Sequence, residues 1–169
     1  PLRRREEIEG RLDAVDELHR ERELRRDLAE QLKEIYDIER LTTKIYTGRA
    51  NARDLVSLRS SLGGLPHVRE LLEETGSSLL GVLREALDPV PEAEALIASA
   101  ITEDPPTTLT EGGIIRDGYN PDLDELRLTS RQGKQWIAKF EAQEAERSDI
   151  PSLKVGFNKV FGYYIEVTN

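Results

Sequence analysis

Three hydrogen-bond donors near the end of the 169-residue chain are the residues best suited to contact a ligand: Lys154, Asn158 and Lys159. An ammonium or amide group beside an exposed turn can donate to phosphate oxygens, as in the backbone contacts that proteins make to nucleic acids. Tyr163 and Tyr164 follow closely and could pack or donate hydrogen bonds. These residues alone leave two interpretations open, a phosphate-contacting turn and an ordinary polar turn.

The donors lie within a pattern that predicts a β-hairpin. Apolar and polar residues alternate over residues 153–158 and again over 163–168, and a period of two is typical of strands. Asn158 and Gly162 are the residues of the connection best able to adopt positive φ. Because a lone two-stranded hairpin is marginal in water, we expect further strands from sequence outside this chain.

A long helix should precede the hairpin. Asn120 offers an N-cap, Pro121 a first helical position, and Asp122 and Asp124 acids for the positive end of the helix dipole. No strong stop occurs before residues 148–151, so the helix is expected to cover about 28 residues, or roughly 42 Å. Its apolar positions are interrupted, which favours an arm over a globule; a kink at Gly133 within one bundle is the alternative. The apolar positions are Leu123, Leu126, Trp136, Ile137 and Phe140.

The first half of the chain predicts consecutive amphipathic helices. Apolar residues recur at helical spacing over residues 8–18, 24–35 and 38–45. Asn51, with Asp54 three residues later, predicts a new helix from about Ala52. We expect it to break at Gly63-Gly64, after which Pro66 opens another helix through about residue 74.

Shorter elements should join these helices to the long one. Helices are expected at residues 78–87 and 91–100, and a loop at residues 102–110, where two prolines and several threonines show no periodicity. Ile114 and Ile115, between glycines, predict a short strand or an extended link. The fold class is therefore mainly α, a multi-helix body with one long helix that ends in a β-hairpin.

Composition excludes several classes of function. The chain has no cysteine, so disulfides and thiolate chemistry are excluded and a cytoplasmic location is expected. No apolar run approaches the roughly 20 residues of a membrane span, so we expect no membrane partner. The net charge is −9, which argues against DNA binding over the whole surface. Residues 151–169 carry +1 and residues 1–150 carry −10, so a local contact remains open.

No catalytic or metal centre is expected in this sequence. Gly63-Gly64 and Gly112-Gly113 lack the spacing and the Lys-Ser/Thr of a phosphate-binding loop, and no serine lies in a nucleophile-elbow motif. His19 and His67 have no second ligand at metal-site spacing. The arginines of residues 3–5 and 25–26 are interleaved with acids, which favours solvated helix faces over a nucleic-acid contact.

Four segments together resemble proteins of the MutS DNA mismatch-repair family. Residues 152–169 (SLKVGFNKVFGYYIEVTN) are similar to the opening of the family's clamp domain, and residues 114–126 (IIRDGYNPDLDEL) to the entry into its lever helix. Residues 47–55 (TGRANARDL) resemble its core segment, and residues 7–15 (EIEGRLDAV) also match in family order. The resemblance covers essentially the whole chain.

The resemblance implies a division into residues 1–150, part of the core and lever domain, and residues 151–169, the first hairpin of the clamp. It implies a lever that couples an ATPase domain to a clamp holding double-stranded DNA, mismatched in the full protein, with a second MutS subunit as partner. ATP and magnesium are implied only for the ATPase domain, which this sequence lacks, so we expect no cofactor and no enzyme activity here. The candidate DNA-binding residues are Lys154, Asn158 and Lys159, and the structural positions are Asn120, Pro121, Trp136, Phe140 and Gly162.

A helical scaffold that binds a protein partner such as MutL, without touching DNA, is the alternative function, and the acidic body suits it. An enzyme is a more distant third. Without a returning lever helix, Trp136, Ile137 and Phe140 should be exposed, so self-association is also expected.

Overall fold

The computed structural model describes residues 4–160 and 162–167. Of the residues discussed above, Arg3, Phe161, Thr168 and Asn169 lie outside these ranges. The chain divides into two compact units, residues 1–116 and residues 117–169. The resemblance to MutS proteins implies a boundary between two family domains at residue 150. That boundary differs from the division into compact units and stays a prediction.

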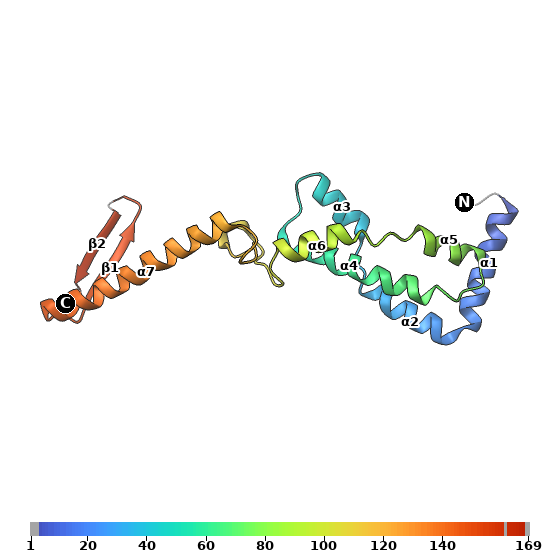
Figure 1. Ribbon diagram of the computed structural model, residues 1–169, viewed down its shortest axis with the longest axis horizontal. Coiled ribbons are helices and arrows are strands. Elements are labelled where there is room, and N and C mark those ends of the chain that lie inside the picture. The colour runs from blue at the N-terminus through green and yellow to red at the C-terminus, as the bar shows by residue number, and fades with distance from the viewer. Residues whose placement is uncertain (1–3, 161, 168–169) are drawn as a thin grey trace. The chain divides into compact units, whose positions relative to one another are not determined.

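Helices make up the first unit (Figure 1). Its α4 is central and packs against α2, α3, α5 and α6, while α1 packs against α2 and α5. The predicted helices at residues 78–87 and 91–100 are confirmed, as is the start at Ala52, where Asn51 and Asp54 form a reciprocal capping box. The helices are α1 (Arg5–Arg20), α2 (Arg22–Lys33), α3 (Ile38–Tyr46), α4 (Ala52–Leu71), α5 (Ser78–Ala86) and α6 (Pro91–Ala100).

The predicted break at Gly63-Gly64 is wrong, because α4 runs without interruption through both glycines and through Pro66. Buried side chains on either side of the expected break explain the continuity: Leu58 and Leu62 precede Pro66, and Val68 follows it. Burial of this stripe outweighs the local preference of glycine and proline against a helix interior.

Two buried clusters form the core of the first unit, and α4 contributes to both. One joins Ala14 of α1 to Val68, Leu72 and Leu80. The other joins Leu41 of α3 to Leu58, Leu62 and Leu65. Since one helix supplies residues to both clusters, α4 holds the remaining helices of this unit together.

The apolar stripe of α1 is largely exposed. Ile8, Leu12 and Val15 are 42%, 60% and 63% exposed, whereas Ala14 is only 5% exposed. The spacing of these residues correctly predicted a helix, but the small Ala14 lies at the packed surface. A short side chain there lets neighbouring helices approach closely, which periodicity alone does not indicate.

Ion pairs hold the segment of residues 101–116 against α4. Ile101 forms an antiparallel bridge with Ile115, in agreement with the predicted extended link. The Glu103 carboxylate pairs with Arg59 of α4 and with Arg116, whose Nη2 is 2.7 Å away. These two guanidinium groups lower the pKa of Glu103 to about 2. The carboxylate therefore stays charged, and the ion pairs persist, throughout the neutral and mildly acidic range.

The second unit holds α7 (Pro121–Ser148), β1 (Leu153–Asn158) and β2 (Gly162–Val167). The predicted long helix and hairpin are confirmed, and α7 runs without interruption through Gly133. The strands are antiparallel, with Leu153 opposite Val167 and Phe157 opposite Tyr163. Among the helices that the structure describes, none is long and apolar enough to cross a membrane.

Candidate nucleic-acid interface

The start of α7 is fixed by its own sequence. The Asn120 side-chain oxygen accepts a hydrogen bond from the Leu123 amide at 3.0 Å, which satisfies one of the free N–H groups of the first turn. Pro121 occupies the first turn, where its missing N–H has no consequence. Asp124 accepts from the Gly118 amide at 2.8 Å and so ties the preceding turn to the helix.

The other end of α7 holds the hairpin in place. Asp149 ends the helix in the left-handed conformation, with φ of 56°, and so turns the chain toward β1. The Glu141 carboxylate accepts a hydrogen bond from the Val155 amide at 2.8 Å, and Leu153 is only 8% exposed. These contacts connect β1 directly to α7, so the helix and the base of the hairpin form one packed body.

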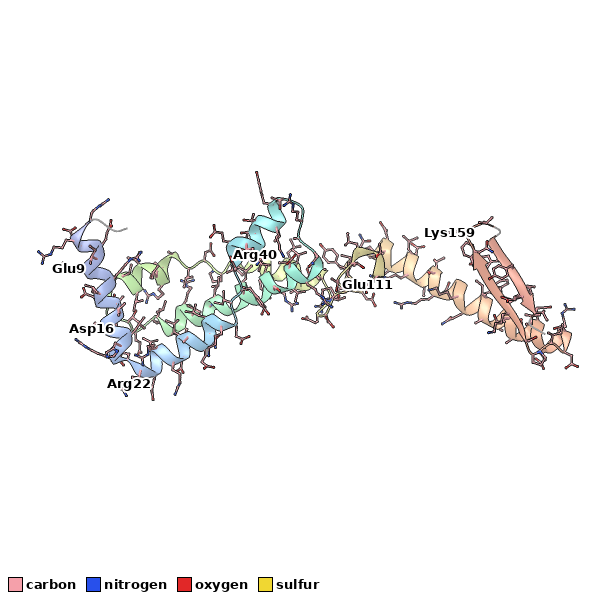
Figure 2. The ribbon with its side chains drawn as sticks, turned by 180° about the vertical axis from the view of Figure 1, so that it is seen from behind. Glu9, Asp16, Arg22, Arg40, Glu111 and Lys159 are labelled. Atoms are coloured by element: carbon pink, nitrogen blue, oxygen red, sulfur yellow. The ribbon has the colours of Figure 1, made fainter. Side chains whose placement is uncertain are left out.

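The strand register separates the candidate donors from the apolar side of the hairpin. Residues directly opposite each other in an antiparallel pair share a face. Lys154 and Asn158 therefore share one face with their partners Glu166 and Gly162. Lys159 follows in the turn, and Figure 2 shows it at the closed end of the hairpin. The structure thus places two of the three donors on one face and the third at the tip.

The three donor side chains differ in the interactions that they make within the protein. Lys154 and Lys159 are exposed and form no ion pair with any residue that the structure describes. The Asn158 side-chain oxygen accepts from the Val160 amide at 3.0 Å, and Gly162 takes φ of 77° at the other end of the connection. Asn158 therefore stabilises the turn, whereas the two lysines are available to an external anion.

Gly156 is a packing position of the hairpin that the sequence pattern did not single out. A Cβ atom at this glycine would lie 2.6 Å from Cζ and 2.7 Å from Oη of Tyr164, the cross-strand partner. The Tyr164 ring therefore lies directly over the glycine backbone. On the other face, Tyr163 packs against Phe157 with ring centroids 5.0 Å apart. Only the register reveals these pairs, although a glycine inside an alternating strand is a recognised signal of close approach.

An apolar groove lies between α7 and the hairpin. Trp136 and Phe140 stack with ring centroids 5.4 Å apart. Trp136 is 65% exposed, as expected, whereas Ile137 and Phe140 are half-buried, contrary to expectation. The groove has a volume of about 500 Å³. It is lined by Gly133, Trp136, Ile137, Phe140, Val155, Tyr163, Tyr164 and Ile165.

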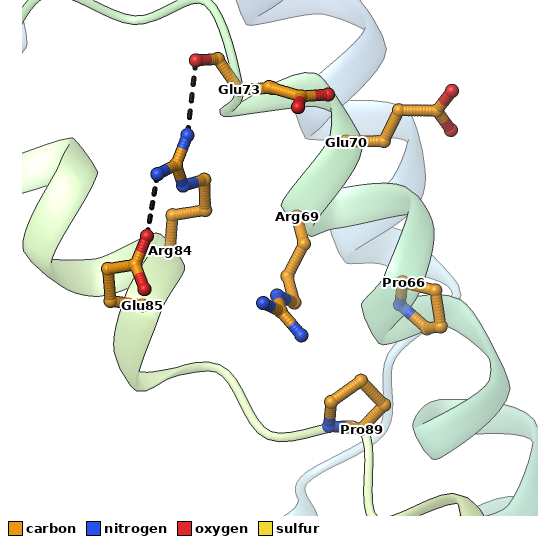
Figure 3. Close-up of a pocket in the computed structure, with 7 residues that line it drawn as sticks. All are labelled: Pro66, Arg69, Glu70, Glu73, Arg84, Glu85 and Pro89. Carbon is orange, nitrogen blue, oxygen red and sulfur yellow. Dashed lines mark hydrogen bonds and ion pairs between the residues drawn. The ribbon is translucent and has the colours of Figure 1, made fainter.

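The first unit has an apolar cavity of about 460 Å³, lined by side chains of α2, α4 and α5, and a separate polar one. A cavity of about 370 Å³ between α4 and α5 contains Arg69 and Arg84 (Figure 3). Arg84 donates to the Glu73 carbonyl at 3.2 Å and to Glu85 at 2.6 Å, so its charge is already balanced. In the described part of the chain, no three His, Cys, Asp or Glu side chains are grouped to hold a metal ion.

The basic residues near the N-terminus are engaged by neighbouring groups of α1 and α2. Arg4 and Arg5 pair with Glu7 and Glu9, and Arg26 pairs with Asp27. Arg25 donates to backbone carbonyls at the end of α1. This arrangement agrees with the interpretation as solvated helix faces.

The fold is thus that of a helical domain whose last long helix carries a β-hairpin, and comparison with known proteins gives this class a family. Residues 1–158 match the family model described as MutS domain III. The chain is 52% identical over its whole length to the DNA mismatch repair protein MutS of Salinibacter ruber, 47% identical over 99% of its length to that of Acetivibrio thermocellus, and 50% identical over its whole length to that of Methanosarcina mazei.

The chain belongs to the MutS family. It spans about a fifth of the curated relatives that it matches, 19% of each of these three proteins.

Proposed function

We propose that this chain is the part of a DNA mismatch-repair protein in which α7 acts as a lever and the β1–β2 hairpin contacts the backbone of double-stranded DNA. The observation that carries the proposal is the pair of exposed lysines, Lys154 and Lys159, on a hairpin packed against the end of a 28-residue helix. The names of the relatives support the repair role.

Backbone contact fits this hairpin better than base recognition. An ammonium group attracts phosphate through charge, a contact that positions a protein on DNA without reading its sequence. The hairpin face that carries Lys154 and Glu166 has no Arg or Gln side chain to read base edges. Its Asn158 already accepts a hydrogen bond from the Val160 amide within the turn. The hairpin should therefore hold matched and mismatched duplexes equally well.

The lever role rests on how α7 is built. Its first turn is capped by Asn120 and its last turns are tied to β1 through Glu141, so displacement of one end is transmitted along about 42 Å of helix. In the full protein we expect ATP and magnesium to act in another domain, and a second MutS subunit to complete the ring around DNA. This chain contributes the mechanical connection.

A cross-linking experiment tests the hairpin contact. The chain has no cysteine, so Val160→Cys, in the exposed turn beside Lys159, can be labelled uniquely with a benzophenone maleimide while both lysines are kept. On illumination at low salt, the label should cross-link to duplex DNA, with and without a mismatch, to the same extent. Ser60→Cys, exposed on α4 of the first unit, is the matched control and should give little product. Equal cross-linking from both positions would contradict the proposal.

The alternative, a scaffold for a protein partner such as MutL, is supported by the exposed groove around Trp136. It requires no DNA contact by the lysines. A label at residue 160 that never reaches DNA would favour it.

A further inference from the structure

The apolar cavity of the first unit, about 460 Å³ in volume, has no part in the proposed function. α2 and α5 both pack against α4 (Figure 1), and in the described part of the chain they do not pack against each other. The cavity lies between these two helices, and Leu65 and Val68 of α4 line it as well. Leu32 of α2 and Leu83 of α5 are both lining residues and about half exposed, so the cavity is open to solvent.

Hydrogen bonds at both ends of α5 fix this helix in a position that leaves the cavity open. The Glu17 carboxylate of α1 accepts from the Gly76 and Ser77 amides, at 2.6 and 2.7 Å, where α5 begins. Arg84, in the last turn of α5, donates to the Glu73 carbonyl at 3.2 Å. Movement of α5 across the cavity would break these bonds, so collapse of the helices does not fill the space.

The chemistry of the lining selects the kind of occupant. All eleven residues that line the cavity are leucine, isoleucine, valine or alanine, so water finds no hydrogen-bond partner among their side chains. A small-molecule site usually has a few polar groups that fix the orientation of the ligand, and an extended peptide needs partners for its backbone. An α-helix satisfies its own backbone and requires only apolar contact. The occupant that fits this lining best is therefore the apolar face of a helix.

The same chain carries a helix face of this kind. Ile8, Leu12 and Val15 of α1 are exposed and follow the spacing i, i+4 and i+7, which places them on one face of the helix. We call these three residues the α1 stripe. α1 packs within its own unit through Ala14, on another side of the helix, so this packing leaves the stripe exposed.

The α1 stripe and the cavity have the same length. The stripe extends over seven residues, which is two helical turns or about 10.5 Å. Among the residues that line the cavity, Leu65 and Leu72 are also seven positions apart, as are Leu80 and Leu87. Three apolar side chains on one helix face can therefore cover the lining from one end to the other.

We propose that two copies of this chain associate through their first units, with the α1 stripe of each copy lying in the apolar cavity of the other. Every copy has one stripe and one cavity, so two equal contacts close the pair and leave neither surface exposed. The inference concerns the first unit and does not depend on the DNA contact proposed for the hairpin.

The oligomeric state of the 169-residue chain tests the inference. Light scattering after size exclusion, from about 5 to 500 μM protein, should show the mass of a monomer change to that of a dimer. Leu12→Glu with Val15→Glu alters the stripe, and Leu32→Lys with Leu83→Lys alters the cavity. Each double variant should raise the dissociation constant by at least about tenfold. All four side chains are about half exposed or more, so circular dichroism of both variants should match that of the parent chain.

Mixing the two double variants distinguishes this contact from general stickiness. The cavity variant keeps its stripe and the stripe variant keeps its cavity, so one contact of the mixed pair is unchanged. In the other contact, the new glutamates face the new lysines and attract them. An equimolar mixture should therefore form a one-to-one complex at concentrations where each variant alone is a monomer.

Two controls locate the contact on the molecule. Leu96→Glu changes an exposed leucine of α6 that does not line the cavity, and the dimer should persist. Trp136→Glu changes the apolar groove of the second unit, the other surface through which self-association is expected, and the dimer should again persist. Loss of the dimer with Trp136→Glu would overturn the inference, as would a parent chain that stays monomeric, double variants that still pair, or a mixture that remains monomeric. Species that grow beyond a dimer would contradict a closed pair.

Discussion

Replacing Leu65 with alanine is expected to lower the free energy of unfolding of the first unit by about 2–5 kcal/mol. Leu65 is only 7% exposed and lies in the cluster with Leu41, Leu58 and Leu62. Truncation removes buried methyl groups and leaves a cavity that the surrounding helices fill only in part. Because α4 supplies both clusters of this unit, the loss should extend to α2 and α6.

Urea denaturation followed by circular dichroism measures this effect. Leu96→Ala is the matched control, because Leu96 on α6 is 59% exposed and its truncation should change the unfolding free energy by about 0.5 kcal/mol or less. Fluorescence of Trp136, the single tryptophan, reports on the second unit and should be unaffected. Similar destabilisation by both leucine variants would contradict the assignment of the core.

Replacing Pro66 with alanine should stabilise the first unit by about 2 kcal/mol. Proline inside a helix costs about 3 kcal/mol relative to alanine, because it has no N–H for the carbonyl of Leu62 and its ring crowds that carbonyl. About 0.4–1 kcal/mol is returned by its restriction of the unfolded chain. Pro66 is exposed and interior to α4, so its replacement removes little buried surface.

Gly63→Ala is the companion variant. A Cβ atom at Gly63 meets nothing within 4 Å, so the substitution should add about 0.5–1 kcal/mol of stability. The same denaturation curves measure both changes. If Pro66→Ala lowers the stability, the chain bends or breaks at this position and α4 is not the continuous helix described above.

The contrast between α7 and α4 shows which features local sequence determines. Both ends of α7 agree with the prediction because cap residues and acids act within one turn, as at Asn120 and Pro121. In α4 the local signals at Gly63-Gly64 and Pro66 were misleading. The spacing of Leu58, Leu62 and Leu65 continued the helical period past the glycines, and burial against α3 and α6 decided the outcome.

The candidate site was only partly predictable. The positions of Lys154 and Lys159 followed from alternation and turn residues, which depend on neighbours in sequence. The contact of Tyr164 with Gly156 and the tie between Glu141 and Val155 depend on register and on the docking of the hairpin. Such contacts arise from packing between distant residues, so the pattern of a single segment does not indicate them.

The central proposal is that the hairpin holds DNA by its phosphates. The most direct test uses a full-length MutS protein that carries this domain with Lys154→Glu and Lys159→Glu, and measures how long it retains duplex DNA. Charge reversal at both positions turns attraction to phosphate into repulsion. We therefore expect faster dissociation from matched and mismatched duplexes alike, with the largest difference from the parent protein at low salt. Binding of MutL should be normal. Unchanged dissociation from DNA at low salt, in a protein that folds normally, would contradict the proposal and favour a hairpin that only packs.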